Sequence, residues 1–118
     1  MATAPLWPAN GIVICNHPAD QFWPVLVSDG SGGVIITWQD NRAAFADFYI
    51  YAQRVTAAGT ILWAANGVRV TNSTIEEFTP KIISDGAGGA IISFYRSQNG
   101  GLVTDVYAQR INSSGTAI

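Results

Sequence analysis

The side chains able to carry out chemistry are few in this 118-residue chain. It has one histidine, His17, and one cysteine, Cys15, and Asp20 follows the histidine by three positions. Nucleophilic catalysis needs a base oriented by a third group, and a metal centre needs several converging ligands. His17 with Asp20 meets neither requirement. We therefore expect no enzyme activity, no metal and no cofactor, with His17 on an exposed loop and Cys15 packed at a strand end.

The aromatic residues suggest a binding function instead. They make up 11% of the chain, and Trp23 and Trp38 flank two predicted loops beside Asp40 and Arg42. An aromatic ring that stacks on a sugar, next to groups that bond its hydroxyls, is typical of carbohydrate sites. One interpretation is thus a glycan site made by His17, Asp20, Trp23, Trp38, Asp40 and Arg42. The alternative, which we favour, is that these rings fill interfaces between packed sheets.

Four charged residues recur at a fixed separation of 56 positions: Asp29 with Asp85, and Arg54 with Arg110. A catalytic Arg/Asp pair is one interpretation. A bridge within or between repeats is the favoured one, because every repeat would need it for structure. The glycine-rich stretch 29–33 lacks the lysine and the following helix of a phosphate loop, so it is interpreted as a hairpin turn.

The chain is an internal repeat of 56 residues. The pair LW at 6–7 returns at 62–63, and the segments SDGxGG and YAQR return at the same offset. Aligning 6–60 with 62–116 without a gap gives 21 identities in 55 positions. We expect one unit over 1–118, with repeat 1 at 6–61 and repeat 2 at 62–118.

Each repeat is expected to form four short strands. Turn residues and apolar runs place the first three strands of repeat 1 at 25–28, 34–39 and 48–56, with counterparts at 81–84, 90–95 and 104–112. A fourth strand is expected at 61–71, where Asn66 and Gly67 mark either a bulge or a tight turn, and its counterpart at 6–15 opens the chain. No window has a helical period. The sequence predicts an all-β fold of four-stranded antiparallel meanders.

A repeat of 56 residues made of four strands is typical of a β-propeller blade, somewhat longer than the roughly 40 to 50 residues of common blade types. A kelch blade is a competitor by length, but its paired glycines follow the second strand, whereas here they precede it. The unit resembles the repeat of multi-bladed β-propellers secreted by bacteria, with DGxGG, an apolar run, an aromatic, YAQR, a glycine turn and LW. The resemblance implies a secreted propeller and little about function. Repeat 2 departs from the pattern at Phe94, Tyr95 and Arg96.

The order of the strands predicts a partner. The chain starts on a fourth strand and stops where the next fourth strand would start, so it holds two four-stranded blades in permuted register. Two blades cannot close a ring, and bare apolar faces and edges aggregate unless paired. Copies can join head to tail, with 6–15 of one chain added to 104–112 of the next. Since propellers have about four to eight blades, we expect a homotrimer or homotetramer whose structural residues are Leu6, Trp7, Trp63, Asp29, Asp85, Arg54 and Arg110.

Composition and charge agree with a self-associating protein. The net charge is −2, and the six basic residues are scattered singly, so no nucleic-acid partner is expected. The apolar stretches are shorter than the roughly 18 residues of a membrane span, so no membrane partner is expected either. Charged residues are 12% against 48% hydrophobic. That is little polar material for the surface of a free 12.5 kDa monomer. The sequence does not identify the cellular compartment, and residues 1–10 show no signal peptide.

Overall fold

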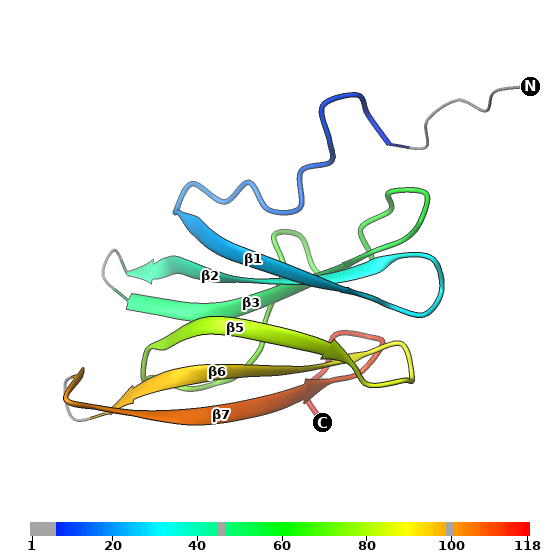
Figure 1. The fold of residues 1–118 in the computed structure, drawn as a ribbon. Helices are drawn as coiled ribbons and strands as arrows, with labels where there is room; N and C mark the ends of the chain where they lie inside the picture. The colour runs from blue at the N-terminus through cyan, green and yellow to red at the C-terminus, as the bar shows by residue number, and fades with distance from the viewer. Residues whose placement is uncertain (1–6, 45–46, 99–100) are drawn as a thin grey trace, which may run out of the picture.

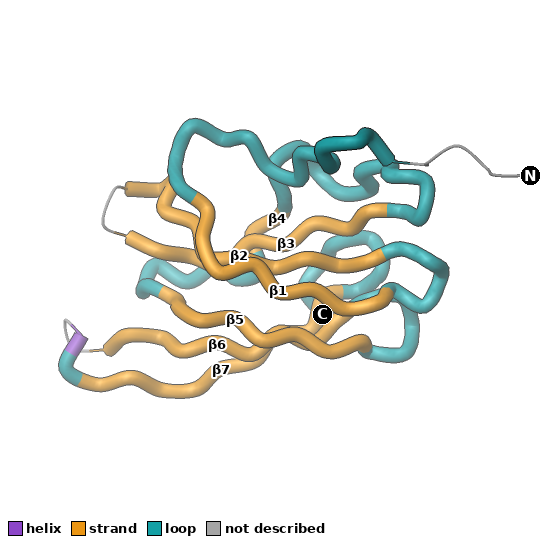
Figure 2. The backbone as a smooth tube through the Cα atoms, turned by 45° about the horizontal axis from the view of Figure 1, so that its top comes forward, coloured by secondary structure: helices purple, strands orange, loops and turns teal. Residues whose placement is uncertain are grey.

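The computed structural model describes residues 7–44, 47–98 and 101–118. Within these ranges the chain forms seven strands and no α-helix. The strands make two antiparallel sheets, with the orders β1-β2-β3-β4 and β5-β6-β7 (Figures 1 and 2). No helix of the described ranges is long and apolar enough to cross a membrane. The all-β antiparallel class expected from the sequence is confirmed.

The strand bounds follow the repeat. The first sheet consists of β1 (Gln21–Ser28), β2 (Val34–Ala44), β3 (Asp47–Val55) and β4 (Val68–Arg69). The second sheet consists of β5 (Glu77–Ser84), β6 (Ala90–Gln98) and β7 (Val103–Ile111). Figure 2 shows the strands of both sheets running lengthwise, with the connecting loops at the two ends of the molecule.

The first strand of each sheet is irregular at the same repeat position. The pairing of β1 with β2 shifts between Phe22 and Val25, and that of β5 with β6 shifts between Phe78 and Lys81. The residues inside the two shifts, Trp23 and Thr79, both have φ of +56°. A bulge explains why these strands begin four residues before the regular apolar run that predicted them.

The two sheets pack face to face, and β5 contacts β1, β2 and β3. Residues directly opposite each other in a ladder point to the same side of a sheet, and successive residues alternate. We call the side of the first sheet that holds Leu26 and Ile36 its front face and the side that holds Val27 and Ile35 its back face. The faces of the second sheet are defined by the equivalent residues: its front face holds Ile82 and Ile92, and its back face holds Ile83 and Ile91. The buried core lies between the back face of the first sheet and the front face of the second, and its members include Ile35, Ile50, Ala52, Ile92 and Phe94.

The fourth strands are much shorter than the sequence predicted. Of the predicted strand 61–71, only Val68–Arg69 is a strand, together with an isolated bridge between Val55 and Ile61. The cause is a turn closed by a hydrogen bond from Gly67 N to Ala64 O, with Asn66 and Gly67 both at positive φ. A left-handed turn of this kind interrupts the ladder.

The N-terminal segment forms no strand over its described residues 7–15. It carries the same turn, with Gly11 N bonded to Pro8 O at 3.0 Å. Figure 1 shows it on the side of the first sheet away from β5. A strand needs a neighbouring strand to pair with, and among the described residues of the chain none pairs with this segment. Leu6 lies outside the described residues.

Candidate functional site

The glycine-rich turn, the aspartate and the arginine form one unit in each sheet. Asp29 Oδ1 accepts hydrogen bonds from Ser31 N at 2.8 Å and Gly33 N at 2.9 Å, and Asp29 Oδ2 accepts one from Arg54 Nε at 2.9 Å. The carboxylate thus holds the β1–β2 turn closed and fastens it to β3. Burial by itself raises the pKa of Asp29, but these bonds outweigh burial and hold the pKa below its usual value.

The second sheet repeats this unit in a more exposed setting. Asp85 Oδ1 accepts from Ala87 N and Gly89 N, and Arg110 Nε lies 3.2 Å from Asp85 Oδ2. The hydrogen bond from Ala87 N is the main cause that lowers the pKa of Asp85. The Arg110 side chain is 47% exposed, against 13% for Arg54. The two arginines therefore share the same kind of aspartate partner and differ in what covers them.

The covering of Arg54 comes from the second sheet. Arg54 Nη1 and Trp63 Nε1 each donate a 3.0 Å hydrogen bond to the carbonyl oxygen of Ser113, in the turn after β7. Trp63 also rests on Gly115, where an added Cβ would lie 2.9 Å from its ring. The carbonyl group of Ser113 is thus a point where both sheets meet.

At the N-terminal end of the chain the equivalent contact is present only in part: within the described ranges its tryptophan bond forms and its arginine bond does not. Trp7 Nε1 donates to Ala57 O at 2.8 Å, and Trp7 and Ala57 are the repeat equivalents of Trp63 and Ser113. Among the described residues no arginine donates to Ala57 O, whereas Ser113 O receives one from Arg54. Trp7 is 39% exposed and Trp63 8%.

Gln53 and Gln109 show the same contrast within the repeated YAQR segment. Gln53 is fully buried, donates from Nε2 to Ala64 O at 2.7 Å and accepts from Trp63 N at 2.9 Å. Both glutamines accept a 3.0 Å bond from the backbone N–H of the next residue. Gln109 is thus held in the same orientation, and no described residue takes the place that Ala64 and Trp63 take beside Gln53.

Strand β7 as a whole is a copy of β3 without its cover. Ile50 and Ala52 of β3 are fully buried, while their equivalents Val106, at 72% exposure, and Ala108 are exposed. In the described part of the chain, β7 pairs only with β6, apart from one bridge between Ile111 and Ala117. The outer edge of β7 therefore presents free backbone hydrogen-bonding groups.

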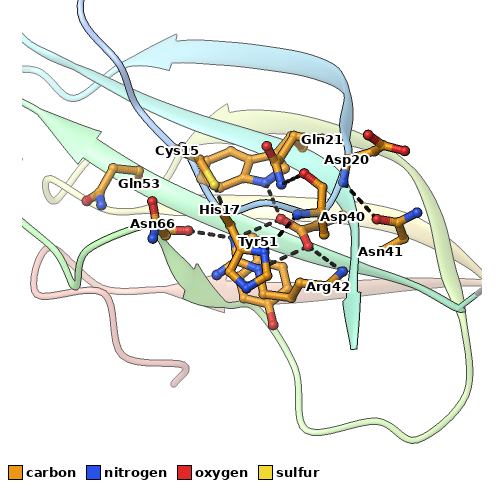
Figure 3. A network of polar contacts seen from close by, with 12 residues as sticks. Cys15, His17, Asp20, Gln21, Asp40, Asn41, Arg42, Tyr51, Gln53 and Asn66 are labelled. Atoms are coloured by element: carbon orange, nitrogen blue, oxygen red, sulfur yellow. Dashed lines mark hydrogen bonds and ion pairs between the residues drawn. The ribbon is translucent and has the colours of Figure 1, made fainter. Parts of the chain in front are cut away.

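A polar cluster on the first sheet gathers three of the six candidate glycan residues. Arg42 Nη2 lies 2.7 Å from Asp40 Oδ2, and Trp38 Nε1 donates to the same oxygen at 3.0 Å. Arg42 also stacks over the Tyr51 ring at 3.8 Å and donates to Asn66 O and Cys15 Sγ (Figure 3). Burial raises the pKa of Asp40, but the bonds from Arg42 and Trp38 outweigh it and hold the pKa below its usual value.

The second sheet builds an equivalent cluster from other positions. Arg96, which occupies the repeat position of Asp40, pairs with Glu77 at 2.8 Å and stacks over Tyr107 at 3.9 Å. Thr71 Oγ1 donates to the same Glu77 oxygen at 2.6 Å. Both sheets therefore place a guanidinium over a tyrosine ring beside a buried carboxylate, but the arginine and the carboxylate come from different repeat positions. Sequence alignment alone does not reveal this, because Asp40 aligns with Arg96.

The six candidate glycan residues do not come together in one open site. Trp38 and Asp40 are buried, so neither offers a free face or oxygen to a sugar. His17 Nδ1 accepts from Ala19 N on its own loop, and Asp20 N donates to Asn41 Oδ1. Trp23 alone among the aromatics of the set is well exposed, at 70%.

In 7–44, 47–98 and 101–118 no group of three or more His, Cys, Asp or Glu side chains is placed to hold a metal ion. Among the residues that the sequence did not single out are Gln53 and Gln109, and their exact recurrence in YAQR was the available signal. Comparison with family profiles, with curated proteins and with solved structures finds no match for this chain.

Proposed function

We propose that this chain is a non-enzymatic β-propeller scaffold that assembles with copies of itself into a closed ring. Each sheet is one blade, and the N-terminal segment 6–15 of one copy completes the second blade of its neighbour. A head-to-tail contact of this kind must close by rotation or grow into a filament. With about four to eight blades in known propellers, three or four copies give six or eight blades.

The observation that carries this proposal is the unequal covering of β3 and β7. The two strands share the sequence YAQR and the same pairing with the preceding strand, yet only β3 has Val68–Arg69 and Trp63 against its outer side. An apolar edge strand left in water is an aggregation hazard, and pairing with a defined partner removes it. The equivalent cover for β7 is the segment around Trp7, Ile12 and Val13.

The N-terminal segment already has the shape of that cover. Its Pro8–Gly11 turn matches the Ala64–Gly67 turn, including the hydrogen bond that closes it. In the assembled pair Gln109 Nε2 donates to Pro8 O of the next copy, and Gln109 Oε1 accepts from the backbone N–H of its Trp7. These bonds repeat those of Gln53 in the first sheet. Because the segment already has its bound shape, association loses little further conformational entropy, which favours binding.

The proposal assigns no catalytic role to the charged residues. Asp29 and Asp40, together with Arg42 and Arg54, all bond to one another or to the backbone at 3.0 Å or less. Saturated ion pairs of this kind fix a structure and leave no group free to exchange protons with a substrate.

Light scattering coupled to size exclusion tests the proposal. We expect a mass three or four times 12.5 kDa at micromolar concentration. Carbonyl groups of Ile50 and Arg54 point outward from β3, so their alternate neighbour Ala52, and hence Ala108 in β7, also faces the outer edge. Ala108→Pro removes one outward N–H without touching the β6 ladder and should give monomers.

Ala108→Thr is the matched control, because it keeps the N–H and suits a strand. It should assemble like the wild type. Circular dichroism checks that the proline variant remains folded. A wild-type mass of 12.5 kDa at every concentration would refute the proposed function, and so would an Ala108→Pro variant that is folded and still assembles.

A further inference from the structure

The packing of the two sheets inside the chain supplies a template for a contact between chains. The front face of the second sheet, with Ile82, Ile92 and Phe94, is filled by residues from the back face of the first. Ile35 and Ile50 lie in this core at 0% exposure. The 56-residue repeat places a front face and a back face on each sheet, and only one of each is used within the chain.

The unused front face is a groove of about 500 Å³ on the first sheet. It is lined by Leu26, Ile36 and Trp38, which are the repeat equivalents of Ile82, Ile92 and Phe94, and by the segment Ile12–Cys15. None of its lining residues is charged. Leu26 is 61% exposed, while its equivalent Ile82 packs against the core.

The unused back face lies on the second sheet. Ile83, at 61% exposure, and Val106 are the equivalents of Val27 and Ile50, which pack in the core of the chain. Ile83 pairs with Ile91, and Tyr95 with Val106, so these four side chains share one face. Contiguous exposed apolar side chains of this kind mark an interaction surface.

We propose that the back face of the second sheet in one copy packs into the front groove of the first sheet in the next copy, with Tyr95 against Trp23. The proposal rests on the proposed function and specifies a surface of the assembly separate from the β7 edge. The occupant of the groove is a second copy, because this chain carries both the groove and the side chains that fill its equivalent.

The aromatic pair follows from two coordinated departures between the repeats. Inside the chain, Gln39 Oε1 accepts a 3.0 Å hydrogen bond from Thr79 N, across the interface between the sheets. The equivalent of Gln39 is Tyr95, at 47% exposure, and the equivalent of Thr79 is Trp23, at 70%. The internal contact is made by the Gln39 amide and the backbone N–H of Thr79, whereas the contact between copies brings two large rings, Tyr95 and Trp23, to the same pair of positions. Aromatic pairs strengthen an interface beyond their buried area.

Disulfide trapping tests this contact in the full chain. In a Cys15→Thr background, which copies Thr71 of repeat 2, the double variant Trp23→Cys/Tyr95→Cys should form covalent multiples of 12.5 kDa on oxidation with copper–phenanthroline. The matched control is Thr79→Cys/Tyr95→Cys. Thr79 is exposed, but its backbone N–H already bonds Gln39 of the same chain, so no second copy meets it and the control should stay at the mass of one chain.

Tryptophan fluorescence of the unmodified assembly gives a second readout. Dilution should shift the emission to longer wavelength as Trp23 becomes exposed, and Trp23→Phe should lose most of this shift. Trp23→Thr should weaken assembly by about tenfold, the size expected from losing one aromatic pair. Tyr95→Phe should preserve it.

The outcomes separate this inference from the proposed function. An assembled protein that neither cross-links nor shows the Trp23-dependent shift would overturn the Tyr95–Trp23 contact and leave the edge-pairing proposal standing. A wild-type chain that is monomeric at all concentrations would overturn both. Equal cross-linking of the Thr79 control would also overturn the contact, because it would show that Tyr95 meets no defined neighbour.

Discussion

Arg54 reaches from the first sheet to the second: its Nη1 lies 3.0 Å from the carbonyl oxygen of Ser113, 59 positions later in the chain. The same guanidinium binds Asp29 through Nε at 2.9 Å. One side chain thus links a hairpin turn, the third strand and the neighbouring sheet. Arg110 makes the first two links and not the third among the described residues.

Removing the two arginines should therefore have unequal effects. Arg54→Ala leaves the buried Asp29 carboxylate without its cation and breaks the bond to Ser113, so we expect the free energy of unfolding to fall by about 2 kcal/mol. Arg110→Ala should lower the stability of the monomer by less, because its side chain is about half exposed and its ion pair is screened by water. Urea denaturation of both variants measures the difference. Equal losses would contradict the bridging role of Arg54.

The aspartate in the same unit predicts a pH dependence. Burial alone would raise the pKa of Asp29, but the hydrogen bonds from Ser31 N, Arg54 and Gly33 N hold the folded-state pKa below the usual aspartate value of 3.8, so the folded protein binds this proton less readily than the unfolded chain. Its contribution to stability is then complete well above pH 3.8 and is lost as the pH falls through 3.8 towards the folded pKa. Asp29→Asn should flatten the decline of melting temperature between about pH 5 and pH 2. A wild-type slope in the variant would contradict this assignment.

The sequence predicted the positions that recur in both repeats better than the positions whose residues differ from one repeat to the other. The glycine turns and YAQR were identified because identical residues recur at 56 positions, and they form hairpin turns and third strands as expected. The ion-pair clusters around Tyr51 and Tyr107 were not predictable in this way. Their arginines, Arg42 and Arg96, come from different repeat positions, and only the fold brings each of them over the equivalent ring.

The predicted length of the fourth strands was wrong for a local reason. The apolar pattern from 61 to 71 is continuous enough to suggest one strand, but Asn66 and Gly67 adopt positive φ and close a turn on Ala64. In the sequence the Asn66-Gly67 pair marks a bulge or a tight turn, and the structure forms the turn. The burial of Trp38 depends on the same turn, since Gly67 lies against its ring.

The glycines that end the β1–β2 and β5–β6 turns, Gly33 and Gly89, should not tolerate substitution. A Cβ on Gly33 would lie 2.1 Å from the carbonyl oxygen of Val55, a backbone atom that cannot move without breaking the ladder. We expect Gly33→Ala to destabilise the fold by about 3 kcal/mol. Gly86→Ala is the comparison, because it meets only the strain of φ +77° with open space around it, and about 1 to 2 kcal/mol is expected. Thermal unfolding of the two variants should rank them in this order.

The two glutamines of the YAQR segments separate folding from assembly. Gln53→Ala leaves the buried Trp63 N without its partner and removes one of the two hydrogen bonds that Ala64 O accepts, so we expect a loss of about 2 kcal/mol in the free energy of unfolding. Gln109→Ala should change the stability of the separated monomer by less than about 0.5 kcal/mol. Because its amide is assigned to Pro8 and Trp7 of the next copy, the same variant should raise the concentration at which assemblies dissociate by about tenfold.

Two measurements on the same pair of variants decide this prediction. Urea denaturation at high dilution reports the monomer, and light scattering over a dilution series reports the assembly. If Gln109→Ala destabilised the monomer as much as Gln53→Ala, its amide would have a partner within the chain, and the N-terminal segment of a neighbour would not be needed to satisfy it. If neither measurement responded to Gln109→Ala, the pairing of β7 with the segment around Trp7 would be wrong in its register.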